Sequence, residues 1–197
     1  MSLEQKINNL ETDLHIMGTL VLDSLVSAVR ALEDKDTAKA SEVMDKDDEI
    51  DDAYMKIDQD WFELMATEQP VASDLRLSTS ILQASLHLER LGDLSVYLGK
   101  TTHEIHDLPI PESLHKIVVE MGDMVIDMAS SALESLKNRD AELALSTARK
   151  DELINSLYNK MLNEVPNISG NKDLYNGLFR LITCVRTLER GGDHAVD

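Results

Sequence analysis

The sequence predicts an all-α protein of six long helices, arranged as two tandem, pseudo-repeated, antiparallel three-helix bundles. Its 197 residues are 43% hydrophobic but only 4% aromatic, a composition that favours helices over sheets. Apolar residues recur every three or four positions along six segments, the period of helices that bury one face. The run Leu-Glu-Arg-Leu-Gly-Asp at 88–93 returns at 188–193 as Leu-Glu-Arg-Gly-Gly-Asp. This internal repeat predicts two copies of one unit.

The first copy contains three predicted helices. The apolar stripe of the first consists of Leu3, Ile7, Leu10, Leu14, Met17, Val21, Leu25, Ala28 and Leu32. The charged run 33–36 has no apolar anchor and predicts a turn, with Asp36 capping the second helix. That helix carries apolar positions from Val43 to Leu64, with Asp47 inside the stripe. Pro70 should end it, and Ser73 and Asp74 should open a third helix that runs to about residue 106.

The second copy repeats this order after the proline-rich connection at 109–111. We therefore predict one domain over residues 1–108 and another over 109–197. In the fifth helix Asp151 takes the place of Asp47, and a sixth helix should begin near Lys172. Short loops make successive helices antiparallel neighbours. The third helix should continue well beyond Asp93, whereas the chain ends four residues after Asp193. We expect a truncated last helix or a differently closed second bundle.

Charge and cysteine content restrict the function classes. A formal charge of −18 argues against binding to a nucleic-acid backbone. The single cysteine, Cys184, permits no internal disulfide, which favours a reducing cytosol, and its position predicts a buried thiol. The N-terminus lacks a basic segment followed by an apolar core, and we expect that no apolar run approaches the length of a membrane span. These features predict a cytoplasmic protein without direct membrane insertion.

The positions of the acidic residues relative to the apolar stripes are the main evidence for a binding site. Pairs of acids four residues apart are weak evidence, because chance alone gives about seven such pairs in this composition. Pairs such as Asp123 and Asp127 lie off the apolar stripe and are typical of a solvated helix face. Six other acids stand in or beside the apolar seam in both repeats: Asp47, Glu89, Asp93, Asp151, Glu189 and Asp193.

Carboxylates drawn toward an apolar seam lose hydration and repel one another, so they need a positive partner. Arg90 and Arg190 could supply it as structural salt bridges. A metal ion that prefers oxygen ligands would supply more charge, and we favour that interpretation. The chain has no Glu-x-x-His motif for a buried di-iron centre, and no cysteine or histidine cluster suggests structural zinc. His194 has no counterpart in the first repeat, where Leu94 stands, and the other histidines share no spacing. No nucleophile-base pair is evident.

These motifs make the chain resemble the PhoU family of phosphate transport regulators. The resemblance rests on residues 69–76 (Gln-Pro-Val-Ala-Ser-Asp-Leu-Arg), 88–93 and 188–196. It implies two similar three-helix bundles whose acidic motifs bind multinuclear clusters of transition-metal ions, iron first, with zinc, manganese or nickel as alternatives. Carried over to this chain, the metal ligands are Asp47, Asp51, Glu89, Asp93, Asp151, Glu189 and Asp193. Asn155 stands where a further carboxylate is expected, so we expect tighter binding at the first cluster than at the second.

The resemblance also implies a function without catalysis. Such a protein limits phosphate uptake and restrains phosphate-starvation signalling. Its implied partners are the ATPase subunit of the phosphate transporter, a sensor histidine kinase where one is present, and a second copy in a homodimer. Two alternatives stay open: a carboxylate-bridged metalloenzyme, either a hydrolase or an oxidase, and a simple metal store.

Overall fold

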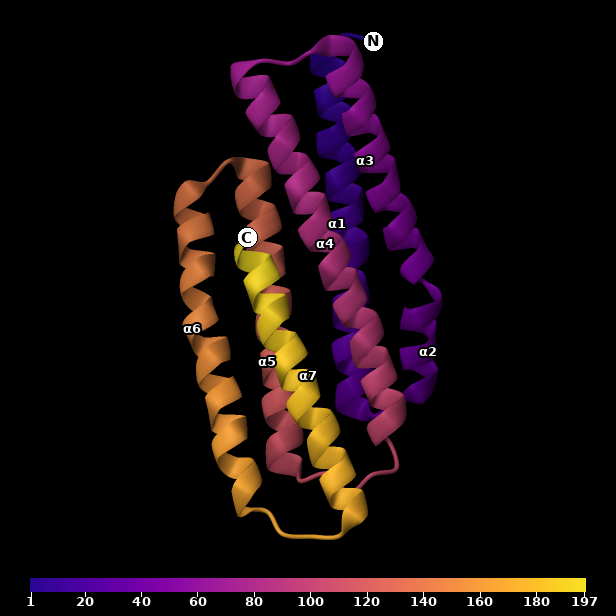
Figure 1. Cartoon of the computed structure of the whole chain (residues 1–197), viewed down its shortest axis with the longest axis vertical. Helices are drawn as coiled ribbons and strands as arrows, with labels where there is room; N and C mark the ends of the chain where they lie inside the picture. The colour runs from indigo at the N-terminus through magenta and orange to yellow at the C-terminus, as the bar shows by residue number, and fades with distance from the viewer.

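The structure, a computed structural model that describes residues 1–197, contains helices and no strands. The elements are α1 (Leu3–Asp34), α2 (Thr37–Asp45), α3 (Asp47–Glu68), α4 (Ala72–Ile105), α5 (Glu112–Asn138), α6 (Ala141–Glu164), a short 3-10 turn η1 (Val165–Asn167) and α7 (Lys172–Val196). The first four pack as one bundle, in which α2 and α3 form one interrupted helix, and α5, α6 and α7 pack as the other (Figure 1). The predicted all-α architecture of two three-helix bundles is confirmed.

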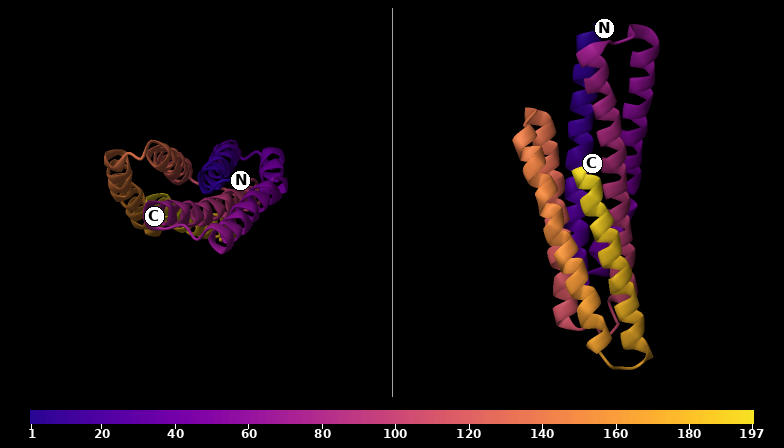
Figure 2. Two further views of the ribbon diagram at one scale, coloured as in Figure 1. Left: turned by 90° about the horizontal axis from the view of Figure 1, so that it is seen from above. Right: turned by 60° about the vertical axis from the view of Figure 1, so that its left-hand side comes forward.

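The two bundles lie side by side and share a central contact. Helix α1 packs against α5, and α4 packs against α7, each pair running antiparallel (Figures 1 and 2). The connection between the bundles is the loop 106–111, where the expected boundary between residues 108 and 109 falls. Helix α4 continues to Ile105, whereas α7 ends at Val196, partway along α5 and α6 (Figure 2).

The core follows the stripes expected from the sequence. Every stripe position of α1 except Leu3 is buried, and so are most apolar stripe positions of α5. An 18-residue window of α1 is apolar enough to cross a membrane by length and composition alone, so the expectation that no run reaches a span is wrong on those criteria. In the structure, however, the apolar side of α1 is packed against α3, α4 and α5.

The expected second helix is interrupted at Lys46, which corrects the prediction of one continuous segment. The Lys46 N–H donates to the Val43 carbonyl, and the Glu49 N–H donates to the Lys46 carbonyl, so one tight turn replaces the regular pattern. Asp47, Asp48 and Glu49 then occupy the first turn of α3. Three consecutive carboxylates are favoured at that position, because the backbone N–H groups of a first turn are unpaired and carry partial positive charge.

Caps explain where several helices begin. The Asp36 carboxylate accepts hydrogen bonds from the N–H groups of Ala38 and Lys39, as predicted, and Asp140 caps α6 in the same way. The expected start at Ser73 is displaced: α4 begins at Ala72, and its N-cap, Val71, makes no side-chain hydrogen bond.

Replacing Asp36 or Asp140 with Ala should therefore lower the free energy of unfolding by about 1 kcal/mol each, because two backbone donors lose their partner. Ser73→Ala is the matched control, since Ser73 caps no helix. Urea denaturation curves of the three variants and the wild type measure these differences. A loss at Ser73 equal to the loss at Asp36 would contradict the assignment.

Candidate metal centres

The first acidic cluster lies where the start of α3 meets the middle of α4. Gly92 positions it, because a Cβ atom there would stand 3.0 Å from Cγ2 of the buried Ile50. The missing side chain lets α3 approach α4 at the level of the acids. Asp47 and Asp51 come from α3, and Glu89 and Asp93 come from α4. The structure thus brings together all four predicted residues of the first repeat.

Glu89 has a buried carboxylate oxygen without a hydrogen bond. Its side chain is 19% exposed, and Oε2 is buried without a hydrogen-bond partner. Arg90 Nε lies 3.3 Å from that oxygen, close enough for an ion pair, but without hydrogen-bond geometry. The same guanidinium, half exposed, also donates from Nη1 to Asp93 at 3.3 Å. Arg90 therefore supplies part of the positive charge expected of a salt bridge and leaves Glu89 Oε2 without a hydrogen bond.

Burial and mutual repulsion raise the pKa values in this cluster. The pKa of Asp47 lies above its ordinary value, chiefly because burial disfavours its charge, and then because Asp51 and Asp93 are nearby. The pKa of Glu89 is raised by burial first and by Asp93 second, against the opposing effect of Arg90. The folded protein thus holds these carboxylates where their negative charge is unfavourable.

The second cluster repeats this arrangement between α6 and α7. Gly192 takes the role of Gly92, since a Cβ there would lie 2.8 Å from Ile154 Cδ1 and 3.4 Å from Asp151 Oδ1. Asp151 comes from α6, and Glu189 and Asp193 come from α7. The pKa of Asp151 is raised by burial and then by Asp193, and the pKa of Glu189 by burial, Asp193 and Asp151.

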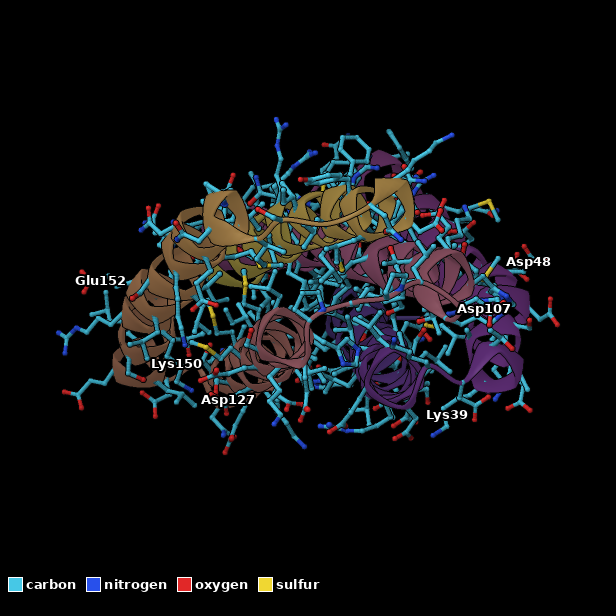
Figure 3. The ribbon with its side chains drawn as sticks, turned by 90° about the horizontal axis from the view of Figure 1, so that it is seen from below. Lys39, Asp48, Asp107, Asp127, Lys150 and Glu152 are labelled. Atoms are coloured by element: carbon cyan, nitrogen blue, oxygen red, sulfur yellow. The ribbon has the colours of Figure 1, made fainter.

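Asn155 changes the chemistry of this second cluster. Its Nδ2 donates to Asp151 Oδ2 at 2.8 Å, a hydrogen bond from an uncharged amide that offsets part of the rise in the pKa of Asp151. The other oxygen, Asp151 Oδ1, is buried without a partner. Each cluster therefore holds one buried carboxylate oxygen that accepts no hydrogen bond. Asp48 and Glu152, the sequence neighbours of Asp47 and Asp151, lie at opposite edges of the molecule (Figure 3). The two clusters belong to different bundles, one between α3 and α4 and the other between α6 and α7.

The pair expected to lie on a solvated helix face, Asp123 and Asp127, is 45% and 64% exposed. Asp123 forms an ion pair with Arg30, and Asp127 forms one with Lys150, at 2.6 Å (Figure 3). Each of these two acids thus has a cationic partner of its own. The two clusters fit metal ions because each combines several carboxylates with a buried oxygen that accepts no hydrogen bond. Oxygen ligands of this type suit Mg²⁺, Ca²⁺, Mn²⁺ and iron.

The structure also shows two arrangements that the sequence did not reveal. His87 Nδ1 and His194 Nδ1 lie 3.3 Å apart, with Asp197 beside them. They meet because α4 and α7 pack antiparallel, which no spacing along the chain indicates.

Ser41 Oγ lies 3.0 Å from His103 Nε2, so a nucleophile-base pair does exist. Ser41 already lies within hydrogen-bonding reach of the Thr37 carbonyl, at 3.1 Å, and no acid orients the His103 ring, which leaves the pair without the third group of a catalytic triad.

The raised carboxyl pKa values predict a pH dependence of stability. A group whose pKa is higher in the folded state stabilises the fold fully below its unfolded pKa and loses that contribution as pH rises through the folded pKa. For Asp47 and Glu89 the loss begins near their ordinary values of 3.8 and 4.5 and continues upward. Without metal, an Asp47→Asn/Glu89→Gln variant should therefore lose less stability than the wild type between about pH 4 and 7.

Urea denaturation at several pH values measures this difference. Asp48→Asn/Asp52→Asn is the matched control, because both residues are exposed and neither forms an ion pair. Asp48 contributes less to the raised pKa of Asp47 than burial, Asp51 and Asp93 do. The pH profile of this control should therefore lie much closer to the wild type than that of the Asp47→Asn/Glu89→Gln variant. A profile for the Asp47→Asn/Glu89→Gln variant that runs parallel to the wild type would show that these acids are not strained by the fold.

The fold and the two clusters define a class: all-helical proteins built from two repeats, each presenting a group of carboxylates. The family model described as "PhoU domain" matches residues 14–102 and 118–197. The chain belongs to the PhoU family.

Relatives and solved structures agree with this assignment. The chain is 32% identical to the "Phosphate-specific transport system accessory protein PhoU homolog" of Pseudomonas aeruginosa, over 96% of this chain and 79% of that protein. It is also 32% identical to the Clostridium acetobutylicum protein of the same description, over 98% and 89% of the two chains. The crystal structure of PhoU from Pseudomonas aeruginosa superposes with a TM-score of 0.93 at 31% identity, covering 98% and 93%.

Proposed function

We propose that this chain is a cytoplasmic, non-enzymatic regulator of phosphate uptake and phosphate-starvation signalling. Support comes from its membership of the PhoU family and from relatives that are named as accessory proteins of phosphate-specific transport systems. The observation that carries the mechanism is the pair of acidic clusters, each with a buried carboxylate oxygen that no donor satisfies. Bound cations would stabilise such a surface, and they would change the charge that it presents to a partner protein.

The proposed ligands are Asp47, Asp51, Glu89 and Asp93 in the first cluster and Asp151, Glu189 and Asp193 in the second. Iron is the first candidate, and zinc, manganese and nickel are the alternatives, bound singly or as multinuclear clusters. Burial and then repulsion raise the pKa values of Asp47 and Glu89, and a bound ion would supply the positive charge that offsets both. The first cluster should bind more tightly, because Asn155 removes one carboxylate from the second and already occupies Asp151 Oδ2.

The proposed partners follow from the family. The ATPase subunit of the phosphate transporter is the first, a sensor histidine kinase is the second, and a second copy of the chain would form a homodimer. The clusters lie in different bundles, so a monomer could present two metal-loaded sites at once. A carboxylate-bridged hydrolase or oxidase is the competing function, since the same oxygen ligands could hold a catalytic metal.

The experiment combines metal analysis with partner titration. Protein loaded anaerobically with Fe²⁺ is assayed for bound metal and titrated with the purified transporter ATPase by calorimetry. A variant with Asp47→Asn, Glu89→Gln, Asp151→Asn and Glu189→Gln should bind less metal and less ATPase, whereas Asp48→Asn/Asp52→Asn should match the wild type. Absence of ATPase binding with and without metal would overturn the regulatory proposal. Metal-dependent turnover of a phosphoester or of oxygen, lost in Glu89→Gln, would favour the enzyme.

A further inference from the structure

Two histidines from different bundles meet at the contact between α4 and α7. His87 lies on α4 and His194 lies on α7, 107 positions apart in the chain. Their Nδ1 atoms are 3.3 Å apart, and their rings are inclined at 50° with centroids 5.5 Å apart. Asp197 Oδ2 lies 4.0 Å from His87 Nδ1. One ligand atom from each of the three residues falls within 4.8 Å of the others.

The spacing of the two nitrogens matches shared coordination of one ion. Two nitrogens bound to Zn²⁺ at about 2.0–2.1 Å in tetrahedral geometry stand about 3.3 Å from each other. A direct hydrogen bond between the two imidazoles is the simpler explanation of this distance, but it gives no role to the carboxylate of Asp197. The Asp197 side chain is 62% exposed, so it can move the short distance needed to complete a set of three ligands.

The histidine pair is partly buried and borders a cavity. His87 is only 27% exposed. Both imidazoles line a cavity of about 550 Å³, whose wall includes Leu88, Leu91 and Ala195. Three protein ligands with a fourth position opening on a cavity form the arrangement of a zinc site that keeps room for water or another small ligand.

We propose that His87, His194 and Asp197 form a binding site for Zn²⁺ or a similar imidazole-preferring divalent ion, which joins the two bundles across α4 and α7. The site is separate from the acidic clusters, which lie between α3 and α4 and between α6 and α7. Its ligands are also of a different kind, because imidazole nitrogen selects zinc, nickel, copper and cobalt, whereas carboxylate sets suit iron, manganese and magnesium. Bound metal would hold α4 against α7 and so stabilise the packing of one bundle on the other.

The test uses Zn²⁺ alone and a background in which the acidic clusters are disabled. In protein carrying Asp47→Asn, Glu89→Gln, Asp151→Asn and Glu189→Gln, calorimetric titration with Zn²⁺ should still show one site. Adding His87→Gln or His194→Gln should weaken that site about 100-fold, and adding Asp197→Asn about tenfold, because each removes one of three ligands. His103→Gln is the matched control: this exposed histidine lies on the same helix, about 24 Å further along it.

Three further measurements make the result independent of folding and of the proposed function. Circular dichroism melts of each variant without metal should coincide with the background protein. Co²⁺ in place of Zn²⁺ should give the strong visible absorption of tetrahedral coordination, and nitrogen NMR should place the metal on Nδ1. Equal Zn²⁺ affinity with and without the histidine substitutions would overturn the site. So would loss of all Zn²⁺ binding in the background itself, a result that would leave the proposed acidic clusters intact.

Discussion

Saturating Fe²⁺ is expected to raise the melting temperature of the wild-type protein by about 5–10 °C more than that of a Glu89→Gln/Asp93→Asn variant. Each site filled at a hundred times its dissociation constant stabilises the folded state by about 2.7 kcal/mol. In a protein of this size, 1 kcal/mol corresponds to about 2–4 °C. The variant should retain only the smaller gain contributed by the second cluster. Scanning calorimetry with and without the ion measures both values.

Without metal, the same variant should melt no lower than the wild type. Its substitutions remove a carboxylate whose burial raises its pKa and a neighbour that repels it. They also break the ion pairing with the half-exposed Arg90, but exposed pairs contribute little to stability. A melting temperature no lower than that of the wild type would show that these acids do not stabilise the metal-free fold, as expected of a metal-binding site. A lower melting temperature would show that they stabilise the fold without metal.

The control removes the same charge from the same region. Asp48→Asn/Asp52→Asn alters two acids four residues apart on α3, each one position beyond Asp47 and Asp51. Both face solvent, so the gain on adding Fe²⁺ should equal that of the wild type. If the cluster variant gains as much as this control, the metal binds elsewhere and the assignment of Glu89 and Asp93 fails.

The helices were predictable because their apolar period alone decides which face is buried. The steps from Ile7 to Leu32 fit a single helix, and the structure buries that stripe. The interruption at Lys46 was not predictable in this way, because Val43 and Ile50 keep the stripe in register on both sides of it. Apolar periodicity reports the buried face, and it is insensitive to a turn that tightens for one residue.

The candidate site was likewise predictable only in part. Asp47, Glu89 and their counterparts in the second repeat could be identified because their positions relative to the apolar stripes follow from the sequence. The sequence does not show which carboxylate oxygen lacks a hydrogen bond, because that depends on side-chain geometry. In Asp151, one oxygen accepts a hydrogen bond from Asn155 and the other accepts none. The meeting of His87 with His194 depends on how one bundle packs on the other, and no local pattern encodes that contact.

Cys184 should react with iodoacetamide at about pH 8 at least about 1,000-fold more slowly in the folded protein than in guanidinium. The thiol is fully buried on α7 beside Thr101 of α4, and burial raises its pKa from 9.0 to about 12. Only the thiolate is nucleophilic, so a rise of about three units removes about a thousandfold of the reactive form. Mass spectrometry of timed samples gives the two rates.

An exposed cysteine provides the control for reagent access. In a Cys184→Ala background, Ser130→Cys places a thiol on the exposed side of α5, where labelling in the folded protein should stay within about tenfold of the unfolded rate. Comparable labelling of Cys184 in the folded and unfolded states would show that α4 and α7 do not pack as described.

The reactivity of Cys184 also reports on the contact between the bundles. Reagent reaches the thiol only when α4 and α7 separate locally, so the labelling rate follows the population of that open state. The same separation would part His87 from His194, which lie on the same two helices. Zn²⁺ should therefore slow the labelling of Cys184 in the wild type and leave it unchanged in His194→Gln. An equal effect of Zn²⁺ on both proteins would mean that the ion acts through the outer acidic clusters, with no bridge between α4 and α7.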